Sequence, residues 1–366
     1  MKKRALYTFY GLLLISCLGL GVSLSSCGSG PKEDSTDKTS IPTTKVEFFN
    51  KKTPKINADS AYAYVKKQVD FGPRVPNTEP HVKCGDWFIE QFKTYGWKVE
   101  VQSFKAKTYD DRELDSRNII ASYEAPNAAR TVLLAAHWDT RHVADKDTKD
   151  VNKPIDGAND GASGVGVLLE LARAISQSPD KPKVNIDIVL FDSEDHGYPN
   201  FVKDQTKQDT WCLGSQYWSK NNDKSYYYGI LLDMVGAKDA KFYKEGYSVR
   251  TANDVVNELW QVAAKIGANG YFIDQKSGEI VDDHVYVNKI KQVPMADIIE
   301  YDPSDPATYF AKYHHTHKDN MDIISKETLG AVGQTVIQYV YNTFGSQQQY
   351  DDFQKSAQQK AKPAAK

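Results

Sequence analysis

The sequence predicts an α/β sandwich, a fold in which a central β-sheet is flanked by helices. Apolar residues recur with helical spacing in five stretches of the chain, and six short apolar runs bounded by turn residues lie among them. Several of these runs are continuously apolar, as expected for strands covered on both faces. Because helices and strands alternate, and no internal repeat divides the middle of the chain, we expect a single layered domain.

The expected helices each carry an apolar face. In the third helix, Val165, Leu168, Leu169, Ala172 and Ile175 fall on one side. The expected helices cover residues 58–72, 81–96, 164–178, 253–267 and 326–344. The expected strands cover residues 97–104, 116–124, 131–137, 184–192, 226–236 and 293–301.

The composition is that of a globular protein. Of the 366 residues, 40% are hydrophobic and 26% are charged. The 46 Lys and Arg residues nearly balance the 48 Asp and Glu residues, so the net charge is −2. Because the sequence also has no basic stripe with interleaved aromatic residues, we expect no nucleic-acid partner.

The N-terminus predicts export and a lipid anchor. A basic start precedes an apolar run over residues 5–24, which is typical of a signal peptide, although such a run can also span a membrane. Residues 24–27, Leu-Ser-Ser-Cys, resemble the lipobox of bacterial lipoproteins. The resemblance implies a signal peptide over residues 1–26, a lipid on Cys27, and a place in the bacterial cell envelope facing the periplasm or the cell surface. An ordinary signal peptide is the alternative.

Both ends of the mature chain are expected to lack a stable fold. Residues 27–45 are rich in Gly, Ser, Thr and Lys, and we interpret them as a flexible lipoprotein tether. The folded domain then covers residues 46–345, and residues 346–366 form a low-complexity tail that we expect to fray. In an oxidising envelope, Cys84 and Cys212 are able to form a disulfide, but the sequence does not establish that they meet.

Ionisable residues gather where the buried runs end. Ligands of layered α/β proteins collect outside the carboxyl ends of the strands, so these side chains mark a candidate site. Residues that end or follow an expected strand are His137, Asp139, Glu194, Asp195, Asp233 and, in the loop after the last strand, His314, His315 and His317. Asp160 stands just before the third helix.

Each of these residues has a simpler explanation when taken alone. Asp160 could simply cap its helix, and the three histidines could lie in a solvated loop. Glu194 and Asp195 could be surface charges. The order of imidazoles and carboxylates at successive strand ends favours metal chemistry instead. Zinc accepts nitrogen and oxygen ligands, a catalytic zinc needs three protein ligands and an open position, and a nearby carboxylate can move protons.

Several other mechanisms have no support in the sequence. The chain has no G-x-S-x-G nucleophile elbow, no Walker loop, no G-x-G-x-x-G and no H-E-x-x-H. Cys212 is a conceivable nucleophile, but the sequence places no base beside it. We interpret it as packed or disulfide-bonded.

Seven motifs in order resemble the zinc aminopeptidase superfamily. They are AHWDT, GANDGASGVGVLLELARAI, VLFDSEDHG, CLGSQYW, ILLDMVGA, DDH and HTHKDN, and the resemblance covers roughly residues 57–344. Within the superfamily the chain is most similar to glutaminyl-peptide cyclotransferases of the animal type and their bacterial relatives. The resemblance implies a single-domain α/β/α sandwich with a twisted, mixed sheet, and a catalytic zinc-dependent domain over residues 46–345.

The resemblance implies two alternative sets of metal ligands. In the cyclases, the positions matching Asp160, Asp195 and His315 hold one zinc. There, Asp233 and Asp283 form a hydrogen-bonding network with the catalytic Glu194. In the aminopeptidases, positions matching His137 and Asp233 join the set and two zinc ions are bound, with Asp160 bridging. This chain keeps all five possible ligands, so the set of ligands does not distinguish the two.

Three features favour the cyclase. They are a long insertion between Asp195 and Gly214, the sequence that follows Asp233, and Asp282-Asp283-His284 where aminopeptidases more often have Ser-Asp-His. Two positions depart from the pattern. Asp195 stands where many relatives have Glu, and His314 stands where cyclases often place an aromatic residue that lines the pocket. His317 is expected in solvent or behind the ligands.

The resemblance therefore implies an enzyme that cyclises the N-terminal glutamine of peptides or proteins to pyroglutamate and releases ammonia. Glu194, beside one zinc, is expected to carry the proton from the α-amine to the departing nitrogen. An aromatic residue, Trp138 or Trp211, is expected to cover the site and exclude water. One alternative is a two-zinc aminopeptidase that removes N-terminal residues. The other is an envelope-anchored binding lipoprotein without activity, which the presence of Glu194 and all the implied ligands disfavours.

Overall fold

The structure is a computed structural model that describes residues 47–305 and 309–361. The predicted signal peptide, Cys27 and the tether lie outside the described residues. The described residues belong to one compact unit. Within the described ranges, no helix combines the length and the apolar character needed to cross a membrane.

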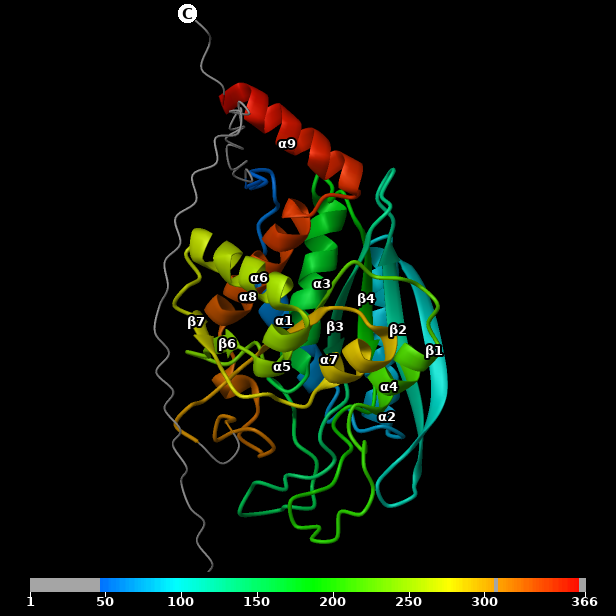
Figure 1. Ribbon diagram of the computed structural model, residues 1–366. Helices are drawn as coiled ribbons and strands as arrows, with labels where there is room; N and C mark the ends of the chain where they lie inside the picture. The colour runs from blue at the N-terminus through cyan, green and yellow to red at the C-terminus, as the bar shows by residue number, and fades with distance from the viewer. Residues whose placement is uncertain (1–46, 306–308, 362–366) are drawn as a thin grey trace, which may run out of the picture. The chain divides into compact units, whose positions relative to one another are not determined.

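A mixed six-stranded sheet forms the centre of this unit (Figure 1). Its strands are β1 (Lys98–Lys107), β2 (Glu113–Tyr123), β3 (Thr131–His137), β4 (Asn185–Phe191), β5 (Gly229–Asp233) and β8 (Met295–Ile299). They are joined in the order β1-β2-β4-β3-β5-β8. The β1–β2 and β2–β4 pairs are antiparallel, whereas β4, β3, β5 and β8 run parallel. All six strands match runs that the sequence predicted.

The helices include the five that the sequence predicted. These are α1 (Ala58–Asp70), α2 (Glu79–Thr94), α3 (Ala162–Gln177), α6 (Asn253–Lys265) and α8 (Lys326–Asn342). Elements that the sequence did not predict are α4 (Leu213–Lys220), α5 (Gly246–Thr251), α7 (Asp283–Tyr286), the π-helix Val287–Lys291, the 3-10 helix Met321–Ile323, α9 (Gln347–Ala361) and a small parallel pair, β6 (Phe242–Lys244) with β7 (Phe272–Lys276). Most of these are short, so their apolar periodicity is too brief to read.

The sheet is buried on both faces, which confirms the predicted sandwich. One face of the parallel strands, including Leu134 and Ile188, packs in the same core as residues of α1, α2, α3, α6 and α8. The alternate residues on the other face, including Leu133 and Val189, pack against Trp218 of α4. Successive side chains of a strand point to opposite faces, so a strand covered on both sides is apolar throughout.

The C-terminal tail differs from the expectation of fraying, because most of it forms α9. The Phe353 ring lies 5.1 Å from the Phe48 ring and 5.4 Å from the Phe344 ring, measured between centroids. Glutamine side chains of the first turn donate to aspartates four residues later, as Gln347 does to Asp351 at 2.9 Å. A few aromatic contacts at one end thus order a segment whose composition alone suggests disorder.

Candidate metal centre and active site

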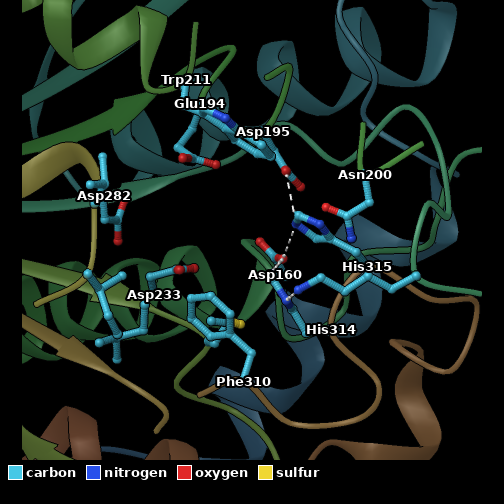
Figure 2. Close-up of a pocket in the computed structure, with 15 residues that line it drawn as sticks. Asp160, Glu194, Asp195, Asn200, Trp211, Asp233, Asp282, Phe310, His314 and His315 are labelled. Carbon is cyan, nitrogen blue, oxygen red and sulfur yellow. Dashed lines mark hydrogen bonds and ion pairs between the residues drawn. The ribbon is translucent and has the colours of Figure 1, made fainter. Parts of the chain in front are cut away.

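The parallel strands deliver the predicted site residues to one edge of the sheet. His137 is the last residue of β3 and Asp233 the last residue of β5, while Glu194 and Asp195 follow β4 closely. Asp160 precedes α3, and the loop at residues 313–320 brings His315 to the same place. Figure 2 shows the labelled carboxylates and imidazoles converging on one cavity.

Asp160, Asp195 and His315 form a group suited to a metal ion. His315 Nε2 lies 3.2 Å from Asp195 Oδ1 and 3.6 Å from Asp160 Oδ2. Neither oxygen of the buried Asp195 has a hydrogen-bond partner among the described residues. A tetrahedral zinc with bonds of about 2.0–2.1 Å holds its ligand atoms roughly 3.3 Å apart. The His315–Asp195 and His315–Asp160 spacings are thus compatible with zinc, and the donor types fit it. The group around Asp160 and His315 whose donor atoms all lie within 4.8 Å of one another also includes His314, whose Nε2 is 3.6 Å from Asp160 Oδ2.

A second group shares Asp160 with the first. His137 Nε2 lies 2.9 Å from Asp160 Oδ1 and 3.1 Å from Asp233 Oδ1. All three side chains offer atoms within 4.8 Å of one another. Although burial opposes it, hydrogen bonding to Asp139, Asp160 and Asp233 raises the pKa of His137 well above its usual value.

Gly161 allows this close approach. A Cβ atom at Gly161 would lie 2.4 Å from the His137 carbonyl oxygen and 2.6 Å from its ring. Any side chain there would push the Asp160 loop away from the end of β3. Glycine is thus required for Asp160 to reach His137.

Residues behind the candidate ligands fix their orientation. Asp145 Oδ1 lies 3.4 Å from Nδ1 of His315, and Arg141 pairs with the same carboxylate at 3.0 Å. Asp319 accepts hydrogen bonds from the backbone N–H groups of Asn159 and Asp160 at 2.7 and 3.1 Å. Partners of this kind set the tautomer and direction of a ligand.

Sequence reasoning did not identify these supporting residues. Asp319 has a sequence signal, because it ends the His-Thr-x-x-Asp pattern that begins at His315. Arg141 and Asp145 have none, since both lie in an irregular loop after β3. Asp139 was predicted at the site, and it accepts hydrogen bonds from the backbone N–H groups of Glu194 and Asp195 at 3.0 and 3.2 Å.

Glu194 lines the cavity beside the first group. Its Oε1 accepts a hydrogen bond from the Cys212 thiol at 3.2 Å. Burial, together with the nearby negative charges of Asp195, Asp282 and Asp283, raises the pKa of Glu194 well above its usual value. The site therefore holds a carboxyl group that keeps its proton to higher pH than an exposed glutamate does.

The acidic residues that the family resemblance associates with Glu194 lie in different surroundings. Asp233 hydrogen bonds to His137, and among the described residues neither Asp233 nor Asp283 hydrogen bonds to Glu194. Asp282 lines the cavity, whereas Asp283 is fully buried. The reason is local: Asp282 caps α7, so consecutive side chains diverge at the start of this helix. Burial and then Asp233 raise the pKa of Asp282 to about 7.

The cavity is small, with a volume of about 230 Å³. Trp211 lines it, while Trp138 is buried in the core and stacks on His81, so Trp211 is the aromatic cover. His314 also lines the cavity, beside Phe310. The remaining lining residues are Lys146, Asp160, Glu194, Asp195, Asn200, Asp233, Met234, Ile280, Val281, Asp282, Ile299 and His315.

Two open questions about single residues are also answered. Cys84 and Cys212 are buried free thiols and do not form a disulfide with each other. His317 is partly exposed, and its Nδ1 lies 3.0 Å from Asp147, on the outside of the ligand loop.

Asp145→Asn is expected to weaken zinc binding by about 10–100-fold, because His315 loses the carboxylate that orients its ring. Zinc affinity is measured by competition with a chromophoric chelator, and thermal unfolding of the chelated protein reports the separate effect on stability. Asp147→Asn, which removes the carboxylate beside His317, is the matched control and should leave the affinity unchanged. Equal affinities for both variants would show that Asp145 does not orient His315.

Comparison with known proteins agrees with this geometry. The profile of peptidase family M28 matches residues 118–340. A glutaminyl-peptide cyclotransferase of Dictyostelium discoideum is 26% identical, covering 78% of this chain and 86% of its own length. A Zn-dependent exopeptidase of Parabacteroides distasonis is 49% identical with a TM-score of 0.76, covering 80% of this chain and 100% of its own. A glutaminyl cyclase of Bacteroides thetaiotaomicron is 47% identical with a TM-score of 0.76, and the match covers 80% of this chain and 99% of that protein. The chain therefore belongs to peptidase family M28, as a homologue of the glutaminyl cyclases.

Proposed function

We infer that this protein is a glutaminyl-peptide cyclotransferase, which converts the N-terminal glutamine of peptides or proteins to pyroglutamate and releases ammonia. The observation that carries the inference is the position of Glu194. It is a carboxyl group with a raised pKa that faces the same small cavity as the Asp160, Asp195 and His315 group. The homology to glutaminyl cyclases supports the same conclusion.

Asp160, Asp195 and His315 would hold one zinc ion. When bound, the ion would act as a Lewis acid on the γ-amide carbonyl of the substrate glutamine. Asp145 keeps the His315 ring in the required direction, and Asp319 holds the backbone of Asp160. These residues supply the rigid support that a catalytic site needs.

Glu194 moves the proton that the reaction requires. The α-amine nitrogen forms a bond to the γ-amide carbon, and the bond from that carbon to the amide nitrogen breaks. Glu194 accepts a proton from the amine and returns it to the departing nitrogen, so ammonia leaves and the carboxylate is regenerated. No water is consumed. The raised pKa makes the Glu194 carboxylate a stronger base toward the amine proton than an exposed carboxylate is.

The walls of the cavity favour cyclisation over hydrolysis. Amine and amide belong to the same residue, so holding them together in a small space supplies most of the catalytic proximity. Trp211 lies over the Arg141 guanidinium at 4.4 Å and is thereby fixed as one wall. Met234, Ile280 and Ile299 form an apolar cluster at the cavity. A dry, crowded site limits the access of attacking water.

The second candidate is a two-zinc aminopeptidase. His137, Asp160 and Asp233 favour it, because their donor atoms also lie close enough to hold an ion. In this reading His137 and Asp233 bind the second zinc, and Glu194 activates a water. It requires two zinc ions per chain, whereas the cyclase requires one.

Incubation with a peptide that begins with glutamine should produce a product lighter by one ammonia, with the peptide chain intact. Mass spectrometry identifies the product directly. Prior treatment with a chelator should abolish the reaction, and added zinc should restore it. Release of free glutamine instead, with two zinc ions per chain in the purified enzyme, would establish the aminopeptidase.

Glu194→Gln is expected to lower turnover by about 10²–10⁴-fold, since general acid–base catalysis contributes about that much. Zinc content, measured by atomic absorption, should stay at the wild-type level because Glu194 is not one of the proposed ligands. Glu279→Gln is a suitable control, since Glu279 is half-exposed and pairs with Arg250 at the surface. Unchanged turnover in Glu194→Gln would exclude the assigned role.

We further propose that Cys27 carries a lipid that anchors the enzyme in the bacterial cell envelope, as the Leu-Ser-Ser-Cys sequence at residues 24–27 suggests. The mature N-terminal peptide should then begin at Cys27 and carry the mass of acyl chains. Cys27→Ala should move the protein from the membrane fraction to the soluble fraction. An unmodified N-terminus at another residue would contradict the anchor.

A further inference from the structure

A third group of potential metal ligands surrounds Glu194. Glu194, Cys212 and Asp282 each offer one donor atom, and the three atoms lie within 4.8 Å of one another. Oε1 of Glu194 is 3.2 Å from Sγ of Cys212. Oδ2 of Asp282, whose residue is only 3% exposed, has no hydrogen-bond partner among the described residues. The group thus contains a soft sulfur donor and a buried, unsatisfied oxygen.

We propose that Glu194, Cys212 and Asp282 form an inhibitory site for a thiophilic divalent cation, such as excess Zn²⁺ or Cd²⁺. This site is separate from the Asp160, Asp195 and His315 group. Figure 2 shows Asp282 and Glu194 on the side of the cavity away from His315. It also differs from the His137, Asp160 and Asp233 group, which contains no sulfur.

The spacing requires only small movements. With Zn–S near 2.3 Å and Zn–O near 2.1 Å, tetrahedral sulfur and oxygen ligands lie roughly 3.6 Å apart. The backbone that carries the ligands is well held. The N–H of Cys212 donates to the Glu194 carbonyl at 2.9 Å, and the N–H of Leu213 donates to the Ser193 carbonyl at 3.1 Å. The three donor atoms lie within 4.8 Å of one another, so closing on one ion is left to the side chains of this fixed backbone.

The charges of the cavity favour a second cation. Five carboxylates line the cavity, whereas Lys146 is its one lysine or arginine among the described lining residues. A divalent ion at the first group offsets two of these negative charges, and Asp233 pairs with His137 at 3.1 Å. Glu194 and Asp282 remain as the acidic pair beside Cys212. On binding a second ion, the Cys212 thiol releases its proton to solvent, and a sulfur–metal bond replaces the S–H···O contact with Glu194.

A cation at this site would block the reaction. This consequence rests on the proposed function, because it requires Glu194 to be the group that moves the proton. A carboxylate bound to a metal ion is no longer free to accept the proton of the substrate amine. The inhibition would therefore appear only at cation concentrations above those that load the first group.

Cadmium titration of the enzyme loaded with one equivalent of zinc tests the proposal. The thiolate-to-cadmium charge-transfer absorption in the ultraviolet should grow to saturation, and the cyclisation rate should fall over the same range of concentrations. In Cys212→Ser the absorption should disappear. The Cys212→Ser enzyme should need at least about tenfold more cadmium than the wild type to lose half of its own uninhibited rate. Removing a residue that only orients a metal ligand already lowers metal affinity by about tenfold, and Cys212 is proposed as a ligand itself.

Cys84→Ser is the matched control, because it removes the other buried thiol of the described region, and its absorption should match that of the wild type. If Cys212→Ser does not fold, Asp282→Asn replaces it and should weaken cadmium binding while the thiol remains. Inhibition without the absorption, or absorption that persists in Cys212→Ser, would overturn the proposal. The absorption reports cation binding even if the enzyme does not cyclise glutamine, so failure of the proposed function is seen separately.

Discussion

Asp160 links the two groups of potential ligands, and the rest of the site depends on its position. One of its oxygens lies 2.9 Å from His137 Nε2 and the other lies 3.6 Å from His315 Nε2. Three features hold it there: the backbone hydrogen bonds to Asp319, the absence of a side chain at Gly161, and the start of α3 directly after it. A displacement of this one carboxylate would break its contacts to two imidazoles that lie far apart in the sequence.

The site concentrates carboxylates and positive-φ backbone positions around one cavity. Burial raises the pKa values of Asp195, Asp233 and Asp282, and the nearby His137, His315 and Arg141 offset this only in part. Residues around the cavity, among them Met234 and His315, adopt positive φ angles of 48° and 56°. Such conformations cost about 1–3 kcal/mol each and persist where the surrounding structure enforces them. A cation that binds only the folded state therefore stabilises the fold.

The loop between β4 and α4 gives the M28 scaffold its particular chemistry. It carries Trp211 as a cavity wall and Cys212 as the hydrogen-bond partner of Glu194. Arg141 connects this loop to the ligands, since its guanidinium donates to backbone carbonyls of Asp195 and Gly197 and also pairs with Asp145. Trp211 and Cys212, which surround the proton-transferring Glu194, thus lie outside the regular strands. The buried Arg141 holds the segment that carries them.

The sequence by itself determined the layered fold, all six strands of the central sheet and five of the helices, because apolar periodicity records which faces are buried. It also placed His137, Asp160, Glu194, Asp195, Asp233 and His315 at one edge, since parallel strands end together. Only the tertiary structure decided that Asp282 rather than Asp283 lines the cavity, that Trp211 rather than Trp138 covers it, and that Cys212 contacts Glu194. The reason is that these choices depend on loop paths and on the direction of single side chains, which long-range packing fixes and local pattern does not record.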